Sequence, residues 1–265
     1  MIKWKIAVGN RCCFYFNFVY IFLLCCSMLV TLTIIRYPKR YTWFALVAMA
    51  IHRFPLWLNK NISFYKLLGC GKNGSFDKHP DWQQWGILTV QDKGLDNLQQ
   101  QTIINNLYGA FIHQWIQLFK CETWTIILEP LEGHGKWDNK EPFGQPAKQP
   151  DYNGPIAVLT RATIRFSKLK SFWQNVAAAA TDMASATGFV TSVGIGELPY
   201  IKQATFSIWN SAADMKAFAY QTHNHKNIIQ KTRKEKWYSE DMFVRFKPLK
   251  TFGTLNGSDP LEGKL

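Results

Sequence analysis

The sequence predicts an α+β fold made of two copies of one unit, and three observations lead to this prediction. The tail LEGHGKWDNKEPF at 131–143 returns in outline as LKTFGTLNGSDPL at 249–261. Matching residues of the two tails keep a constant offset of 118 positions, as between Pro130 and Pro248. The hydrophobic periodicity also follows the same order in both halves. A repeated tail and a repeated order of elements together indicate a repeated domain.

Each half reads as β-α-β-β-α-β. In the first half we expect strands at about 30–36, 62–70, 85–90 and 123–129, and helices at about 40–51 and 94–119. In the second half we expect strands at about 156–164, 189–196, 203–209 and 241–247, and helices at about 167–182 and 211–236. This order is the ferredoxin-like unit. Because its helices cover only one sheet face, we expect the two sheets to pack face to face as a pseudo-dimeric α+β barrel, with a cavity between them.

These elements divide the chain of 265 residues into four parts. Residues 1–28 form an apolar N-terminal extension, 29–143 the first repeat, 144–155 a linker rich in proline and glycine, and 156–265 the second repeat. The extension is long enough for a membrane span or anchor. It is also compatible with a cleaved signal peptide, or with an upstream extension of a protein that starts at Met28.

The net charge of +13 suits nucleic acid, an anionic membrane surface, or an acidic partner such as a small electron carrier. No zinc finger, helix-turn-helix or ribonucleoprotein motif accompanies it, so we expect no nucleic acid partner. None of the six cysteines has CxxC or zinc-site spacing, which is typical of reduced thiols in an intracellular protein.

The sequence contains no P-loop, HExxH motif, nucleophile elbow or paired acidic motif, so no catalytic residue is assigned. Gly194 and Gly196 form a lone GxG that no helix follows, which argues against a dinucleotide site. They indicate either a strand end with an unusual backbone or a close approach of a ligand to the backbone.

One histidine stands out as a candidate iron ligand. His225 shares a helical face with Met215 and Phe218, and we expect this face to look toward the sheet. An inward helical histidine can be an axial haem ligand or a core residue with a local hydrogen bond. His223 is expected to point to solvent.

Three arginines on predicted strands are candidate anion partners. Arg245 lies in MFVRF, and Arg161 and Arg165 lie in LTRATIR. Each could pair with a carboxylate such as a haem propionate, or be an ordinary edge or surface residue. We assign Arg245 and Arg165 to the cofactor site.

The second half resembles the spheroidene monooxygenase family of carotenoid biosynthesis. The resemblance rests on GPIAVLTRATIR, GIGELP, TFSIW, AFAY, His225, WYSEDMFVRF and DPL within 154–261. It extends to 29–143 through WFALVAMA, FYKLLGCG, TWTIILEPL and the GKW…EPF tail. Leu255 departs from the pattern, because the resemblance implies tryptophan there.

The resemblance implies an enzyme that uses haem, O2 and electrons from an acidic ferredoxin-type donor. It would introduce a keto group at C-2 of an acyclic carotenoid, by two hydroxylations at one carbon and loss of water. His225 matches a histidine of the family pattern and is the candidate ligand of the haem iron.

From the fold and this resemblance we expect Phe218, Gly194, Gly196 and Trp237 to line the substrate cavity. The predicted location is the cytoplasm or the cytoplasmic membrane surface, where the apolar substrate dissolves. Two alternatives stay open. One is a cofactor-independent monooxygenase on the same barrel, of the antibiotic-biosynthesis kind. The other is a binding protein for haem or an apolar ligand without turnover.

Overall fold

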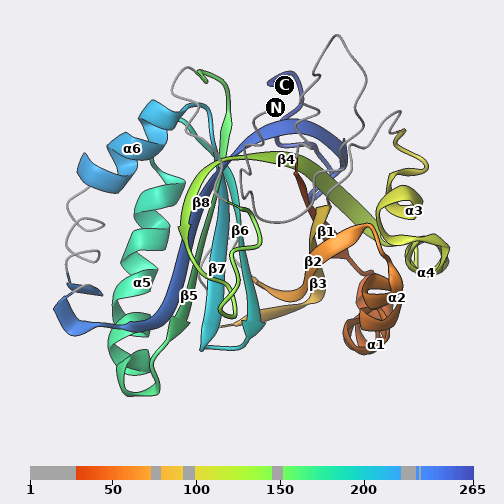
Figure 1. Cartoon of the computed structure of the whole chain (residues 1–265), viewed down its shortest axis with the longest axis horizontal. Helices are drawn as coiled ribbons and strands as arrows, with labels where there is room; N and C mark the ends of the chain where they lie inside the picture. Colours follow the sequence, from red (N-terminus) through yellow and green to blue (C-terminus); the bar gives the residue numbers. More distant parts are fainter. Residues whose placement is uncertain (1–27, 73–78, 92–98, 145–151, 222–230, 233) are drawn as a thin grey trace, which may run out of the picture.

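Strands form the centre of the molecule and helices flank it on two sides (Figure 1). The structure, a computed structural model, describes residues 28–72, 79–91, 99–144, 152–221, 231–232 and 234–265. Eight strands close into an antiparallel barrel. The predicted α+β class and barrel are therefore confirmed.

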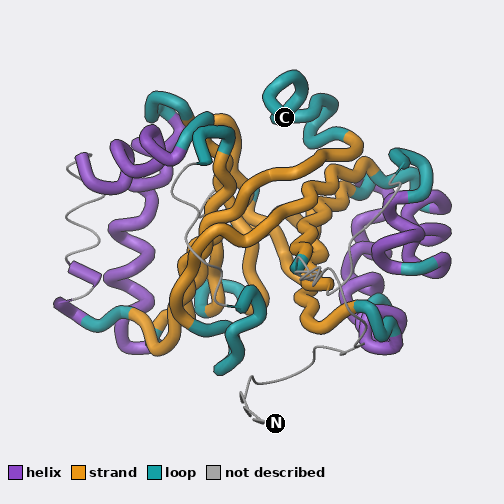
Figure 2. The backbone as a smooth tube through the Cα atoms, turned by 45° about the horizontal axis from the view of Figure 1, so that its top comes forward, coloured by secondary structure: helices purple, strands orange, loops and turns teal. Residues whose placement is uncertain are grey.

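The first half contains β1 (Leu29–Arg36), η1 (Lys39–Tyr41), α1 (Thr42–Ile51), α2 (Arg53–Leu58), β2 (Ile62–Gly71), β3 (Pro80–Gln91), α3 (Ile103–Tyr108), α4 (Ala110–Leu118) and β4 (Glu122–Gly135). The second half contains β5 (Ile156–Ile164), η2 (Phe166–Lys168), α5 (Leu169–Ala184), β6 (Phe189–Leu198), β7 (Lys202–Trp209), α6 (Ala212–Gln221) and β8 (Tyr238–Gly253). Around the barrel the strands follow the order β1-β3-β2-β6-β7-β5-β8-β4. The helices of each half stay on their own side, α1 to α4 opposite α5 and α6 (Figures 1 and 2).

The helix expected at 94–119 begins at Ile103 among the described residues, since 99–102 form a turn and 94–98 lie outside them, and it is interrupted. Helix α3 ends at Gly109, whose φ of +89° lies in a region that other residues rarely adopt, and α4 begins directly after it. The helix expected at 40–51 is followed by a second short helix, α2, after His52. The predicted helix 211–236 is confirmed over α6 to Gln221 and at residues 231, 232, 234 and 235, which are also helical; 222–230 and 233 lie outside the described residues.

The last strand of each half is longer than the sequence predicts. β4 and β8 pair antiparallel from Trp124 opposite Gly253 to Gly135 opposite Met242. β8 also pairs with β5 of its own half. The extra length is stabilised by the pairing between halves, which the local sequence does not encode. On the other side, β2 meets β6 at Gly69 and Gly196, which closes the barrel.

Alternate residues of the strands fill the barrel. On β1, for example, Val30, Leu32 and Ile34 point inward and are almost fully buried. Side chains from both repeated tails join this interior cluster: Trp137 and Phe143 from the first tail, Leu255 and Leu261 from the second. Packed apolar side chains therefore occupy much of the barrel interior, where the sequence predicts an open cavity.

The two tails are held in equivalent ways by two glutamates near the starts of β4 and β8. Glu240 accepts hydrogen bonds from the backbone N–H groups of Asp138 (3.1 Å) and Asn139 (2.8 Å). Glu122 accepts from the backbone of Gly257 (2.6 Å) and the hydroxyl of Thr254 (2.8 Å). Each glutamate thus ties down the tail that belongs to the other half.

The matching glycines Gly135 and Gly253 also share one conformation. Their φ angles are +91° and +80°, and a Cβ atom on either would lie about 2 Å from a carbonyl oxygen of the neighbouring strand. Both positions therefore require glycine. The residue-by-residue equivalence of the tails seen in the sequence is a real structural equivalence.

Helices long and apolar enough to cross a membrane are absent from the described part of the chain. Residues 1–27, on which the predicted anchor falls, lie outside it. The strand that begins at Leu29 follows directly, as expected from its run of β-branched residues.

We predict that Trp137→Ala destabilises the protein by about 3–5 kcal/mol, because it removes a large side chain from the packed barrel interior. Trp43→Ala is the matched control, since Trp43 is 78% exposed whereas Trp137 is 1% exposed. Urea unfolding followed by circular dichroism measures both. Equal stabilities of the two variants would show that the tail does not contribute to the core.

Candidate functional site

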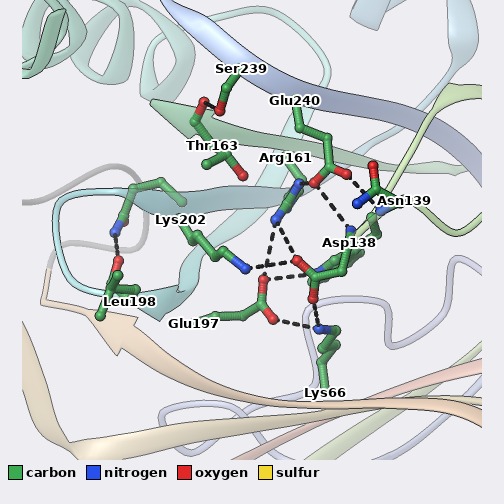
Figure 3. Close-up of polar contacts among 12 residues, drawn as sticks. Lys66, Asp138, Asn139, Arg161, Thr163, Glu197, Leu198, Lys202, Ser239 and Glu240 are labelled. Carbon is green, nitrogen blue, oxygen red and sulfur yellow. Dashed lines mark hydrogen bonds and ion pairs between the residues drawn. The ribbon is translucent and has the colours of Figure 1, made fainter. Parts of the chain in front are cut away.

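A cluster of charged side chains lies inside one end of the barrel (Figure 3). It contains three cations and three carboxylates: Lys66, Arg161, Lys202, Asp138, Glu197 and Glu240. Lys66 and Asp138 come from the first half and the others from the second. The formal charges cancel, and the cluster joins the two halves.

Arg161 is the centre of this cluster. It follows Ala157 and Leu159 on the inward face of β5, and its side chain is only 1% exposed. Its guanidinium pairs with Glu240 and lies 3.4 Å from Glu197. The guanidinium also lies over the indole of Trp137, 5.5 Å from the ring centre. A buried charge needs such partners because an unpaired one would cost several kcal/mol.

The carboxylates receive further hydrogen bonds. Glu197 accepts from Lys66 (2.6 Å) and from the indole N–H of Trp137 (2.8 Å). Glu197 reaches these partners because a register shift between β6 and β7 leaves it as an extra residue on β6. Lys202 donates to Asp138 at 2.7 Å.

These contacts favour the ionised forms of Asp138 and Glu240. Burial alone would raise the pKa of Asp138, but hydrogen bonds and charge from Lys202 and Lys66 lower it to about 2. For Glu240 too, burial alone would raise the pKa, but hydrogen bonds from the backbone of Asn139 and from Arg161 lower it. A carboxylate with a pKa near 2 does not exchange protons at neutral pH. Asp138 is therefore suited to ion pairs that hold the two halves together and unsuited to proton transfer at neutral pH.

A different site emerges where helices cover the outer face of the barrel. In the first half this layer is completely filled. The outward residues of β1 include Thr31 and Thr33, both 0% exposed, which bond to the hydroxyl of Tyr108 at 3.3 and 2.7 Å. One continuous apolar cluster surrounds them, from Leu29 to Ile35 along the strand.

In the second half the described side chains of the corresponding layer are split into two clusters. Along the outward face of β5, Val158 belongs to one apolar cluster and Ile164 to another. Thr160 lies between them and is exposed, although its strand is in the middle of the sheet. Its neighbour in register, Thr205, is buried, and its hydroxyl has no hydrogen-bond partner. Between the two clusters the described side chains thus leave Thr160 exposed beside a buried hydroxyl that has no partner.

Two predicted site residues flank this gap on opposite sides. Phe218 of α6 stacks on Trp209 with ring centres 5.1 Å apart, in the cluster at one end. Trp237 is fully buried in the cluster at the other end, beside Phe172, and donates to Glu235 at 2.8 Å. Both residues lie outside the barrel, on the face of the sheet that the helices cover. Met215 and Phe218 face the sheet as predicted.

The two predicted cavity glycines lie on β6. Gly194 is buried and pairs with Thr205, so it adjoins the gap. Gly196 has a structural explanation, because a Cβ atom there would lie 2.8 Å from the carbonyl oxygen of Lys202. The group that approaches Gly196 closely is therefore the backbone of the neighbouring strand β7.

The two predicted cofactor arginines are far apart. Arg245 pairs in register with Val158, whereas Arg165 follows the end of β5 and donates to the carbonyl of Tyr238 at 3.0 Å. Seven residues of strand separate these points, roughly 23 Å. Arg245 already forms an ion pair with Glu132. The structure therefore does not bring both arginines to one small anion.

His225 and His223 lie outside the described residues. Within the described ranges, no group of three or more His, Cys, Asp or Glu side chains is arranged to hold a metal ion.

Two cavities lie near these features. The larger, about 490 Å³, opens between the end of α5 and α6, and its walls are Asp182, Ser185, Ala186, Thr187, Asp214, Ala217 and Phe218. The smaller, about 320 Å³, is lined by Gly133, His134, Gly135, Glu141, Phe143, Gly144, Met242 and Val244. The larger cavity adjoins the split layer through Phe218.

Sequence reasoning did not find Thr160, Thr205 or the charged cluster as a unit. Alternation along LTRATIR places Arg161 with inward apolar residues and could have marked it as a buried charge. Nothing in the local sequence distinguishes Thr160 from Thr33. Thr33 is covered and Thr160 is exposed only because different helices pack above them.

We predict that Asp138→Asn lowers stability by about 1 kcal/mol at pH 7, a value reduced for screening because Asp138 is 36% exposed. The carboxyl pKa is about 4 in the unfolded chain and about 2 in the folded protein. The contribution is thus complete above pH 4 and is lost as the pH falls toward 2. Urea unfolding from pH 7 to pH 3 measures the difference. Glu262→Gln, an exposed carboxylate outside the cluster, is the control, and a pH-independent difference for Asp138→Asn would contradict the assignment.

No family model matches the chain. Among solved structures, an aldoxime dehydratase in complex with butyraldoxime aligns over 90% of this chain and 86% of its own, with a TM-score of 0.58 and 8% identity. A second aldoxime dehydratase structure covers 90% of this chain and 88% of its own, with a TM-score of 0.55 and 9% identity. At such low identity this similarity concerns the fold alone.

Sequence relatives carry more information. Spheroidene monooxygenase of Cereibacter sphaeroides is 33% identical over 235 residues, which are 88% of this chain and 70% of that protein. Spheroidene monooxygenase of Rhodobacter capsulatus is 33% identical over 218 residues, 82% of this chain and 88% of that protein. Similarity of this extent, together with the barrel and the tails, shows that the chain belongs to the spheroidene monooxygenase family.

Proposed function

We propose that this protein is a haem-dependent monooxygenase that introduces a keto group into an acyclic carotenoid or a similar apolar lipid. Each hydroxylation takes up one O2, two electrons and two protons, and releases one water. Two hydroxylations at the same carbon, followed by loss of water, leave the ketone. An acidic ferredoxin-type protein is the proposed electron donor, and the net charge of +13 favours its docking.

The observation that carries the haem proposal is the split layer of the second half. A haem needs a flat apolar site between secondary-structure elements, with polar atoms at its margin. The clusters around Trp209 and Trp237 supply apolar walls on two sides of the exposed Thr160. Thr205 supplies a buried hydroxyl without a partner. These residues fit a large planar cofactor, which would supply the activation of O2.

Within this proposal the residues of the chain have distinct roles. Phe218 and Trp237 bound the site, Gly194 allows a close approach to β6, and His225 is the candidate iron ligand. Arg165, which is exposed at the end of β5, is better placed for a propionate than Arg245, which Glu132 already neutralises. The apolar walls also exclude water from the site.

We also propose that the two halves are tandem ferredoxin-like repeats within the predicted boundaries. The common order of elements and the shared conformation of Gly135 and Gly253 support this proposal.

The first test is an absorption spectrum of the purified protein with haem supplied, before and after dithionite. We expect a stoichiometric Soret band that shifts on reduction and with CO, and O2 uptake that depends on an acyclic carotenoid. A folded protein that binds no haemin yet consumes O2 with substrate would favour the cofactor-independent alternative. Haem binding without substrate-dependent O2 uptake would favour a binding protein.

We predict that Thr160→Trp weakens haem binding at least tenfold, because the new side chain occupies the space between the two apolar clusters. The unfolding temperature without haem should change little, since Thr160 is exposed. Ala213→Trp is the control, because Ala213 is exposed on α6, on the side away from Met215. Haemin titration followed at the Soret band measures both. Equal haemin affinity of Thr160→Trp and wild type would show that haem does not bind in this layer.

We predict that His225→Ala abolishes the haem spectrum or shifts it to that of a weakly ligated form, and that His223→Ala leaves it unchanged. The reason is that helical spacing in the sequence predicts His225, and not His223, on the face of Met215 and Phe218. Spectra of the ferric and ferrous proteins measure this. An unchanged spectrum in His225→Ala would assign the iron to another ligand.

A further inference from the structure

The helices of the first half expose an unusual amount of apolar surface. Helices α1, α2 and α4 carry eight exposed large hydrophobic side chains: Trp43, Phe44, Val47, Phe54, Trp57, Leu58, Phe111 and Leu118. We call this surface the α1–α2–α4 face. Several of these side chains are more than half exposed, including Trp43 (78%) and Trp57 (69%). Large contiguous apolar patches on a protein surface mark a site of interaction.

Helix α1 shows that this exposure is not needed for folding. Its inward side is already apolar, with Ala45 and Ala48 buried against the sheet. Its outward side carries Trp43, Phe44 and Val47, where a water-facing helix would carry polar residues. By contrast, the described side chains of α5 and α6 on the opposite side include no large exposed hydrophobic residue.

Ring contacts join several side chains of the α1–α2–α4 face. Phe44 of α1 stacks on Phe119, just after α4, with ring centres 4.5 Å apart. His52, between α1 and α2, meets Phe111 of α4 edge to face at 6.2 Å. Phe54 and Trp57 lie 6.4 Å apart on α2. Figures 1 and 2 show these helices gathered on one side of the barrel.

The charge of this side has one sign. Residues 37–61 and 99–121, which include all four helices, contain no Asp or Glu. They contain Lys39, Arg40, Arg53, Lys60 and Lys120, all of which are exposed. Exposed tryptophan and phenylalanine combined with lysine and arginine are typical of elements that lie in the interface of an anionic bilayer.

We propose that the α1–α2–α4 face docks on the surface of an anionic lipid bilayer, with its aromatic side chains inserted between headgroups. Basic residues near such a surface are attracted to its anionic headgroups. A second copy of the chain fits less well, because a face-to-face dimer would bring together two sets of cations without a carboxylate. An acidic protein would satisfy the charge but would not explain the size of the aromatic surface.

This inference specifies the membrane partner of the proposed function. It rests on that function only for the biological purpose of the docking. The docking face and the split layer of α5 and α6 lie on opposite sides of the barrel (Figure 1). A carotenoid dissolves in the bilayer, so docking would bring the enzyme to its substrate. The test requires neither haem nor substrate, so its failure would leave the haem proposal untouched.

The experiment compares the full-length protein with the triple variant Trp43→Ser, Phe54→Ser, Trp57→Ser. Binding is measured by co-sedimentation with vesicles of phosphatidylglycerol and phosphatidylcholine, and with vesicles of phosphatidylcholine alone. We expect the wild type to bind anionic vesicles, more weakly as salt rises, and the variant to bind at least tenfold more weakly. Hydrogen exchange should show protection of 42–58 when anionic vesicles are added.

The matched control is Phe166→Ser, Leu198→Ser, Leu249→Ser, which removes exposed hydrophobic residues elsewhere; Phe166, at 76% exposure, matches Trp43. Thermal unfolding verifies that both variants are folded. All the proteins share residues 1–27, so any contribution of that segment is common to them. Equal binding of wild type and triple variant would overturn the proposal, as would equal binding to neutral and anionic vesicles. Protection of 42–58 that depends on protein concentration without lipid would instead assign the face to self-association.

Discussion

Each half of this protein has a sheet with two apolar faces, and its own helices can bury only one of them. The other face must be covered by the other half, and this requirement determines much of the structure. β4 and β8 extend past their own sheets to pair with each other, and the repeated tails fill the barrel interior with Trp137 and Leu255. The glutamates that hold the tails, Glu122 and Glu240, act across the two halves for the same reason.

The charged cluster is the polar counterpart of this arrangement. Arg161 lies on an inward strand position, where its charge would be costly without partners. Its carboxylate partners Glu197 and Glu240 come from its own half, and Asp138 comes from the tail of the first. A buried pair of this kind contributes little net stability relative to apolar packing, but it disfavours arrangements in which the partners do not meet. It thereby fixes how the first tail enters the barrel.

Once the barrel has met this requirement, the two helical layers are free to differ. The first layer is filled inside by Tyr108 and is apolar outside, whereas the second is split inside around Thr160. This difference separates the two proposed tasks: docking on a lipid surface on one side and holding a cofactor on the other. Two halves with the same order of elements thus acquire different chemistry through the residues that line their helices.

The sequence by itself determined the order of the elements, the equivalence of the tails and the α+β class. These features depend on local periodicity and on glycines such as Gly135 and Gly253, whose conformation is encoded where they stand. It did not determine the break at Gly109, the full length of β4 and β8, or the filling of the barrel, because these depend on partners from distant segments. Arg161 and Thr160 look alike in the sequence as polar residues on one strand. Alternation places them on opposite faces of the sheet. Only the tertiary structure decides that Arg161 is buried among carboxylates and that Thr160 is exposed, because each face packs against a different part of the chain.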